Sequence, residues 1–296
     1  MTPWQRHYSR HAPWFLLPAL LLLGVFVVWP LLRALWWSLH GADLLDPSRQ
    51  RWVGLVQYSS LLGDQRFRQA FGNTALFALL VVPAQTGLAL LLALWVNRLE
   101  PAWRWLRYAF FAPTVVALPV LSIVWTLLYQ PAQGEEMGLV NALLSGLGVT
   151  PRAWLRDPAT ALVALAAMSI WQGVGLQMMV FVAGLQTLRR DVLEAALLDG
   201  ANGWQRLRHV ILPALRNTTA FVVTVTTIAS FRLFVQPYLM THGGPEDATV
   251  SVIQLIYETT FISNDLGRAS AAALVFLVLI ATLTAAQRRL LREEQG

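Results

Sequence analysis

The chain has 296 residues, 56% of them hydrophobic and only 13% charged, and its mean hydropathy of +0.52 excludes an ordinary soluble enzyme and is typical of an integral membrane protein. Basic residues outnumber acidic ones by 22 to 16, but all are arginines scattered at the ends of apolar stretches, which excludes a nucleic-acid-binding surface. The absence of cysteine excludes disulfides, thiolate metal sites and a cysteine nucleophile.

Six stretches are long and apolar enough to cross a bilayer as helices, because lipid offers no partner for free backbone N–H and C=O groups. They lie near residues 14–38, 71–96, 108–128, 161–185, 218–240 and 271–286. The first could instead be a cleaved signal peptide, but its apolar run is too long and no small-residue cleavage site follows it. The sequence therefore predicts an all-α membrane protein with a single transmembrane domain, residues 1–296.

Arginine-rich short loops stay in the cytoplasm, so the arginines indicate the orientation of the chain. With the N-terminus inside, thirteen arginines fall in inner segments, seven in outer segments and two within spans. Four arginines in the first outer loop run against the rule, although long loops obey it less strictly. We therefore expect both termini to be cytoplasmic.

Polar side chains interrupt the apolar stretches near 71–96 and 161–185. The first contains Asn73, Thr74 and Gln85, and the second contains Trp171, Gln172 and Gln177. An indole ring and amide groups are suited to stacking on a sugar and binding its hydroxyls. Hydrogen bonds between neighbouring helices are the competing explanation for each of these residues taken singly. Trp171, Gln172 and Gln177 are therefore candidates for the substrate pathway.

The longest inner segment, 187–216, is predicted to form two short amphipathic helices around a turn. Asp191 with Glu194, and Asn202 with Gln205, each have the spacing of a capping box at a helix start. Gly200 lies between them, where a turn requires positive φ. One apolar face comprises Val192, Leu193, Ala196 and Leu197, and the other Trp204, Leu207, Val210 and Ile211. Taken alone, this pattern also fits a helical hairpin lying on the membrane surface.

The spacing within this segment is specific. Glu194-Ala195-Ala196 is followed after three residues by Gly200, and after nine more by Val210, Leu212 and Pro213. This arrangement resembles the EAA loop of permease subunits of binding-protein-dependent ABC importers, with valine in place of isoleucine and with Arg189 where the family often has proline. Further features resemble the carbohydrate-type members, such as the maltose and glycerol-phosphate permeases: Asp199-Gly200-Ala201, Phe234, Pro237, Tyr238, THGGP at 241–245, Thr249, Tyr257, Phe261 and Leu266-Gly267.

The resemblance implies a type I ABC importer permease that moves a sugar or oligosaccharide across the bacterial cytoplasmic membrane, or alternatively glycerol phosphate or another polar solute. It implies four kinds of partner: a second permease, two ATPase subunits that bind ATP and Mg, an extracytoplasmic solute-binding protein, and membrane lipid. It also implies a coupling helix that docks on an ATPase, comprising Glu194, Ala195, Ala196, Asp199, Gly200 and Ala201. Glu194 could also act only as a capping residue.

The stretch near 218–240 contains a charged residue, Arg232, with Gln236 one helical turn further on. An ionisable group inside a helical bundle is costly, so both residues join the substrate-pathway candidates. Arg232 could bind a sugar hydroxyl, a phosphate or an acid of a partner chain.

The remaining motifs predict no catalytic residue, no metal site and no cofactor bound by this chain. The five histidines lack metal-ligand spacing, and a chain without lysine has no P-loop, so ATP would be hydrolysed by another subunit. A secondary transporter or a membrane-embedded enzyme would require carboxylates within the spans, and the expected spans contain none.

Overall fold

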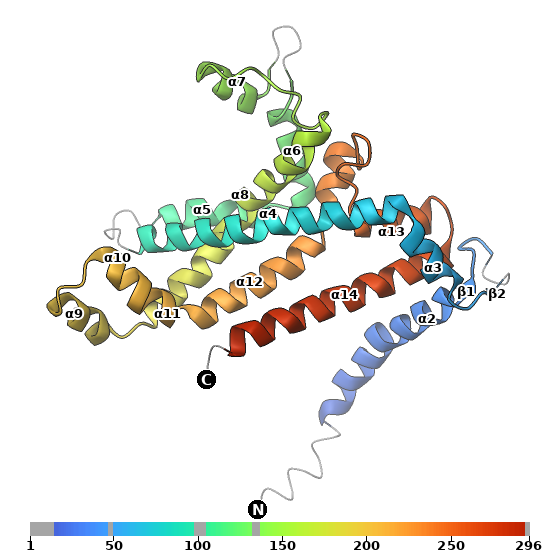
Figure 1. Ribbon diagram of the computed structural model, residues 1–296, viewed down its shortest axis with the longest axis horizontal. Coiled ribbons are helices and arrows are strands. Elements are labelled where there is room, and N and C mark those ends of the chain that lie inside the picture. The colour runs from blue at the N-terminus through green and yellow to red at the C-terminus, as the bar shows by residue number, and fades with distance from the viewer. Residues whose placement is uncertain (1–14, 47–49, 98–104, 132–136, 294–296) are drawn as a thin grey trace, which may run out of the picture. The chain divides into compact units, whose positions relative to one another are not determined.

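The structure is a computed structural model, and it describes residues 15–46, 50–97, 105–131 and 137–293 (Figure 1). The chain divides into two compact units. The first comprises Met1–Asp64 and Ile256–Val278, and the second comprises Gln65–Leu255 and Leu279–Gly296. The two chain ends, expected to be cytoplasmic, lie outside the described residues.

Helices account for nearly all of the regular structure. The first unit contains a long helix, Phe15–Ser38, which includes η1 (Gly24–Val28) and α2 (Trp29–Ser38), then β1 (His40–Gly41), β2 (Arg51–Trp52) and α3 (Val56–Gly63). The second contains α4 (Gln65–Val96), α5 (Leu106–Val115), α6 (Leu118–Leu128), α7 (Leu139–Gly146), α8 (Pro158–Gln186), α9 (Arg190–Leu198), α10 (Gly203–Arg206), η3 (Leu207–Ile211), α11 (Leu212–Ala214), α12 (Arg216–Phe231) and η4 (Pro237–Thr241). Two helices run through both units: α13 (Val252–Phe261) and α14 (Leu266–Glu293).

Within the residues that the structure describes, four helices are long and apolar enough to cross a membrane: Phe15–Ser38, Gln65–Val96, Pro158–Gln186 and Leu266–Gln287. Two bent helix pairs bring the number to six if each pair is one span. Leu106–Val115 and Leu118–Leu128 meet at 102°, and Gly203–Ala214 and Arg216–Phe231 meet at 68°. The expected all-α membrane fold is therefore confirmed, apart from a two-stranded ribbon that pairs His40 with Trp52.

Two of the expected spans are not continuous helices. The stretch 108–128 breaks at Val116 and Ala117, which have extended backbone, and Pro119 occupies the first turn of α6, where its missing N–H costs nothing. The stretch 218–240 breaks after α12. Pro237 cannot donate to the carbonyl of Leu233, and the Ser251 hydroxyl donates to that oxygen instead, at 2.5 Å. A proline thus follows each break within a few residues.

Proline also explains two of the π-helical turns, η1 and η3. Each begins six residues before a proline, and its last hydrogen bond runs to the residue just before that proline. The N–H of Trp29 bonds to Gly24 O ahead of Pro30, and the N–H of Leu212 bonds to Leu207 O ahead of Pro213. The proline ring crowds the carbonyl four residues earlier, and an i to i−5 bond relieves that contact.

In the first unit, the start of α14 packs on the segment that follows α2. A Cβ atom on Gly267 would lie 2.3 Å from the carbonyl oxygen of His40, so only glycine allows this approach. The N–H of Leu266 donates to Ala42 O at 3.0 Å, and Arg268 forms an ion pair with Asp64. These contacts join two parts of the unit that are far apart in the sequence.

In the second unit, α8 packs against α4 and α5, and α4 packs against α12 (Figure 1). Glycines on α8 permit the close approach. A Cβ on Gly175 would lie 2.0 Å from Phe110 O on α5, and one on Gly173 would lie 2.4 Å from the Gln85 amide on α4. Small residues at such contacts let helix backbones approach closely in a membrane. The core of this unit is therefore built around α8.

The loop after η4, which contains the THGGP sequence, is bound to the start of α4. Arg66 forms an ion pair with Asp247 at 3.2 Å. The Asn73 amide donates to the carbonyls of Asp247 and Val250, at 2.7 and 3.0 Å, and the Thr74 hydroxyl accepts from the N–H of Val252. Asn73 and Thr74 therefore bind this loop and the start of α13.

Candidate functional site

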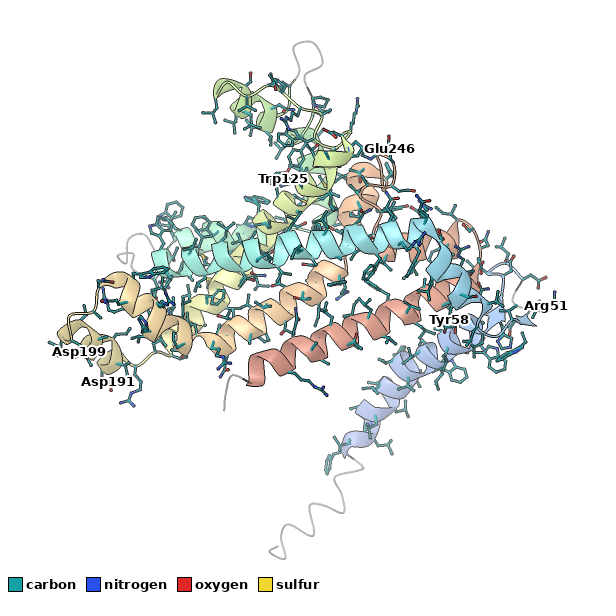
Figure 2. The ribbon with its side chains drawn as sticks, in the orientation of Figure 1. Arg51, Tyr58, Trp125, Asp191, Asp199 and Glu246 are labelled. Atoms are coloured by element: carbon teal, nitrogen blue, oxygen red, sulfur yellow. The ribbon has the colours of Figure 1, made fainter. Side chains whose placement is uncertain are left out.

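The segment expected to couple to an ATPase folds as two short helices, α9 and α10, joined by a turn. Figure 2 shows Asp191 in the first turn of α9 and Asp199 directly after its last residue. The expected capping box at Asp191 is wrong, because α9 begins at Arg190 with Arg189 as its N-cap and Asp191 inside the first turn. Asp191 instead pairs with Arg189 at 2.5 Å, and this hydrogen bond holds the pKa of the carboxyl below its usual range.

The turn after α9 follows the sequence expectation. Gly200 has φ of +78°, its N–H donates to Leu197 O at 3.1 Å, and the N–H of Ala201 donates to Ala196 O at 3.0 Å. This pair of bonds is a Schellman motif, which closes the carbonyl end of a helix and favours glycine at this position. The turn fixes the direction in which the chain leaves α9.

The second capping box is confirmed. The Asn202 side chain accepts from the N–H of Gln205 at 2.9 Å, and the Gln205 side chain accepts from the N–H of Asn202 at 2.8 Å. Two of the free N–H donors at the start of α10, those of Asn202 and Gln205, are thereby satisfied within four residues. Local hydrogen bonds therefore close the end of α9 and the start of α10 on either side of the turn.

The change Asn202→Ala is expected to destabilise the start of α10 by about 1 kcal/mol, because it removes one half of the capping box. Hydrogen exchange at the Gln205 amide should accelerate about fivefold, the equivalent of that energy. Mass spectrometry of the 200–210 peptides would measure it. Asn202→Asp keeps an acceptor oxygen and is the matched control, and equal acceleration in both variants would contradict the capping role.

The outer surface of α9 and α10 combines large exposed apolar side chains with exposed carboxylates. Leu198 is 90% exposed and Trp204 is 66% exposed, and Glu194, Ala195 and Asp199 are also exposed. On the expected apolar face of α9, only Leu193 and Ala196 are half-buried, whereas Val192 and Leu197 are exposed. A compact helix pair that presents leucine, tryptophan and a carboxylate outward has the character of a protein-docking surface.

A polar cavity of about 300 Å³ lies among α4, α5, α6, α8, α12 and the break that follows α12. It contains four of the five predicted pathway residues: Gln172, Gln177, Arg232 and Gln236. The other lining residues are Phe77, Val81, Gln85, Thr114, Leu118, Ser169, Gly173, Leu176, Val225, Thr226, Ala229, Ser230 and Leu233. Tertiary packing thus brings together polar groups from four separate parts of the chain.

Some polar groups of the cavity bind each other. The Gln177 amide donates to Thr226 Oγ1 at 2.5 Å, which leaves Gln177 Oε1 buried with no hydrogen-bond partner among the described residues. The Gln236 amide donates to Ser169 Oγ at 3.1 Å. The side chain of Gln172 has no hydrogen bond to any described residue. An unsatisfied buried acceptor beside a free amide favours a polar ligand or water in this space.

Arg232 lies at the break after α12, where it is the C-cap. A cation there faces the negative end of the helix dipole, which lowers the cost of placing the charge inside the bundle. Its side chain is exposed to the cavity and forms no hydrogen bond or ion pair within the described part of the chain. The guanidinium is therefore available to a ligand.

Trp171 is the predicted pathway residue that does not line the cavity. It projects from a different side of α8 than Gln172, and its ring lies 5.4 Å from that of Trp125 on α6. Sequence reasoning also passed over Thr114, Ser169, Thr226 and Ser230, which are small hydroxyl residues. The spacing of Thr226 and Ser230 on one helical face was the available signal, but hydroxyls in membrane helices usually bond to their own backbone.

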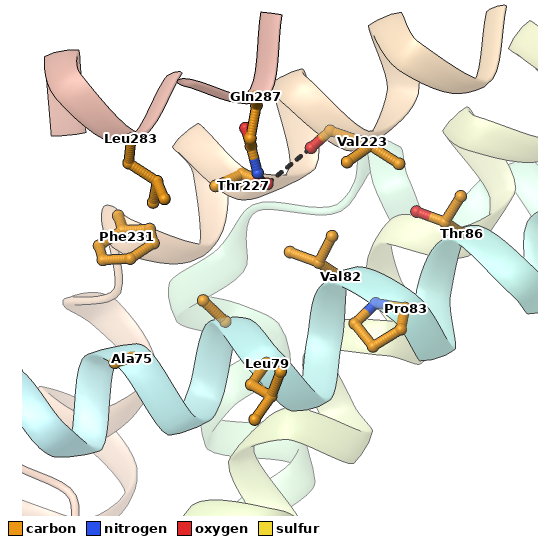
Figure 3. A pocket seen from close by; sticks show the side chains of 11 residues that line it. Ala75, Leu79, Val82, Pro83, Thr86, Val223, Thr227, Phe231, Leu283 and Gln287 are labelled. Atoms are coloured by element: carbon orange, nitrogen blue, oxygen red, sulfur yellow. Dashed lines mark hydrogen bonds between the residues drawn. The ribbon is translucent and has the colours of Figure 1, made fainter. Parts of the chain in front are cut away.

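A second cavity, of about 540 Å³, lies between α4, α12 and the end of α14 (Figure 3). Its lining is mostly apolar: Ala75, Ala78, Leu79, Val82, Pro83, Thr86, Val223, Thr227, Phe231, Leu283 and Gln287. The Gln287 amide donates to Thr227 Oγ1 at 3.0 Å (Figure 3). This space offers few groups to a polar solute. The described residues also contain no group of three or more His, Cys, Asp or Glu side chains placed to hold a metal ion.

Apolar helices long enough to span a membrane, a polar cavity among them and a rigid exposed helix pair at one end define a transport permease. Residues 14–293 match the family described as "Binding-protein-dependent transport system inner membrane component", and the chain belongs to this family. It is a multi-pass protein of the bacterial inner membrane and a transport subunit, not an enzyme. The resemblance to permeases of binding-protein-dependent ABC importers is confirmed.

Relatives and a solved structure agree with this assignment. The alpha-glucoside transport system permease protein AglF of Rhizobium meliloti is 33% identical, over 90% of this chain and 79% of its own length. The sn-glycerol-3-phosphate transport system permease protein UgpA of Agrobacterium fabrum is 32% identical, over 92% and 91%. A chain of a bacterial ABC transporter that imports the acidic polysaccharide alginate superposes with a TM-score of 0.83 at 19% identity, covering 99% of both chains. At this identity the likeness shows a shared fold, that of an ABC importer permease.

Proposed function

We propose that this chain carries a sugar or oligosaccharide across the cytoplasmic membrane as one permease subunit of an ATP-driven importer. The observation that supports this substrate class best is the cavity around Gln172 and Gln177, where amide and hydroxyl groups converge. Sugars are recognised by such groups, because each hydroxyl can both donate and accept a hydrogen bond. The names of relatives such as AglF support the same substrate class.

The partners follow from the family. We expect a second, similar permease, two cytoplasmic ATPase subunits that bind ATP and Mg, and an extracytoplasmic solute-binding protein. The proposed coupling residues are Glu194, Ala195, Ala196, Asp199, Gly200 and Ala201. The small side chains of Ala195 and Ala196 would allow the helix to seat deeply in a cleft, and Glu194 would pair with an arginine of the ATPase. ATP binding would close the ATPases, draw the coupling helices together and open the cavity outward.

A second candidate substrate is glycerol phosphate or another anionic polar solute. Arg232 favours it, because a guanidinium with no partner among the described residues lies in the cavity lining. Guanidinium binds phosphate and carboxylate groups bidentately and more strongly than it binds neutral hydroxyls. A neutral sugar would depend mainly on the amide of Gln172, and an anionic solute mainly on the guanidinium of Arg232. Substitutions of these two residues therefore distinguish the two substrate classes.

Uptake by the reconstituted importer should respond differently to Gln172→Ala and Arg232→Gln. With a neutral sugar, Gln172→Ala should lower uptake about tenfold, the equivalent of one lost hydrogen bond, and Arg232→Gln should have the smaller effect. With an anionic solute, Arg232→Gln should lower uptake by about a hundredfold, because a charged hydrogen bond is lost. Gln186→Ala, an exposed glutamine at the end of the same helix, is the control.

Calorimetry on the cognate solute-binding protein would identify the substrate used in this assay. A neutral mono- or oligosaccharide supports the first substrate class, and a phosphorylated or otherwise anionic solute supports the second. If the three variants all transport the identified substrate at the rate of the unaltered chain, the cavity is not the substrate pathway.

A further inference from the structure

The connection between α6 and α8 contains a short helix, α7, that is attached directly to the end of α6. The N–H of Gly138, the N-cap of α7, donates to Gln130 O at 3.2 Å. A Cβ atom on Gly138 would lie 2.4 Å from the carbonyl oxygen of Leu128, the last residue of α6. The helix therefore begins within contact distance of the end of α6, the second half of a bent candidate span.

The inner face of α7 is fixed by one buried side chain. Asn141 is completely buried, and its amide donates to Gln130 O at 2.8 Å and to Arg152 O at 3.0 Å. Its carbonyl oxygen accepts from the N–H of Arg152 at 3.0 Å and from Trp154 Nε1 at 2.9 Å. Because the carboxamide makes four hydrogen bonds, it holds both ends of the connection against the start of α7.

The other side of α7 is apolar and uncovered. Leu139, Leu143 and Leu147 are spaced four residues apart and form a ridge, with exposed fractions of 57%, 63% and 79%. The residues of α7, LVNALLSG, include no charged side chain. A rigid helix that holds three leucines outward would be unfavourable in water, so this ridge requires an apolar partner.

We propose that α7 lies in the membrane interface, with the leucine ridge inserted among the acyl chains of the leaflet opposite the coupling loop. Because α8 crosses the membrane once between α7 and the coupling loop, the two lie on opposite sides. The exposed side chains of Arg152 and Arg156 follow α7 and supply the charge complementarity, since guanidinium groups beside an apolar ridge bind lipid phosphates.

A lipid surface fits these features better than a protein partner does. A soluble binding protein that docks and is released needs polar and charged contacts, and α7 offers only leucine, alanine, glycine and one serine on its exposed side. Trp154, half-buried beside Asn141, is a residue type that favours the headgroup level. The attachment to α6 also places α7 at the depth where that span ends.

The chain contains no cysteine, so single cysteines can report on this helix without further changes. Leu143→Cys places a probe on the ridge. Ser145→Cys, exposed on the other edge of the same helix, is the matched control. Each purified variant would be labelled with an environment-sensitive fluorophore. It would then be reconstituted with unlabelled partner subunits in vesicles of phosphatidylethanolamine and phosphatidylglycerol.

Quenching by a nitroxide near the top of the acyl chain is expected to be about twofold or more stronger for the ridge probe than for the control probe, because interfacial helices bury one face to a shallow depth. Aqueous iodide should show the reverse order. Equal access of iodide to both probes would overturn the proposal. So would a ridge probe that escapes both quenchers, or that becomes shielded only when the solute-binding protein is added, because a protein would then cover the ridge.

Discussion

Replacing Glu194 with arginine is expected to abolish ATP-dependent uptake. Glu194 is exposed on α9, and the proposed coupling requires its carboxylate to meet an arginine of the ATPase. The substitution removes that charge pair and places like charges together, which should weaken ATPase binding by about 3 kcal/mol, roughly a hundredfold. The amount of ATPase that co-purifies with the permease and the uptake rate are the two measurements.

Arg208→Glu is the control for this change, because Arg208 is an exposed charge in the same segment but outside α9. Its charge reversal should leave ATPase co-purification at the level of the unaltered chain. An arginine-to-glutamate change on the ATPase that restores binding to the Glu194→Arg variant would identify the paired residue. If Glu194→Arg retained both the ATPase and full uptake, Glu194 would be only a surface residue of α9.

The change Gly175→Ala is expected to cause the largest loss of stability among single-methyl additions to this chain. Its new Cβ would lie 2.0 Å from Phe110 O, and because that contact is with backbone, α5 must move away from α8. Overpacking of this kind costs about 1–3 kcal/mol, more than the roughly 1 kcal/mol that alanine gains in helix propensity. Tryptophan fluorescence during thermal unfolding in detergent should show a midpoint several degrees lower, on the scale of about 2–4 °C per kcal/mol.

Gly87→Ala on α4 is the matched control, because a Cβ there would meet no atom within 4 Å. The same substitution should leave the midpoint unchanged or raise it slightly through helix propensity. Since α5 and α8 both border the polar cavity, Gly175→Ala should also lower uptake. A Gly175→Ala variant as stable as Gly87→Ala would show that α5 and α8 do not approach as closely as the structure indicates.

Local features of the coupling segment were predictable, because their hydrogen bonds connect residues a few positions apart. The Asn202 and Gln205 capping box and the positive φ of Gly200 depend only on neighbouring residues. The expectation failed at Asp191, where Arg189 competes for the carboxylate and the helix starts two residues earlier than a capping box at Asp191 requires. Sequence spacing alone does not decide whether an aspartate binds the backbone N–H groups that follow it or a neighbouring arginine.

The helix breaks could be predicted only in part from the sequence. Pro119 and Pro237 are visible in the sequence, and proline often interrupts a helix. However, Pro83 lies inside the unbroken helix α4, so proline alone does not mark a break. The break after Phe231 also depends on Ser251, 18 residues from Leu233, which donates to the Leu233 carbonyl that Pro237 leaves free.

The sequence by itself determined that this is a membrane protein, how many apolar stretches it has and which segment resembles the family's EAA loop. Those properties depend on composition and short-range spacing, which the environment of each residue hardly alters. Only the tertiary structure decided that Gln172, Gln177, Arg232 and Gln236 share one cavity whereas Trp171 packs against Trp125. Neighbouring residues on a helix project about 100° apart. Which of them points into the cavity therefore depends on how α8 packs against the helices around it.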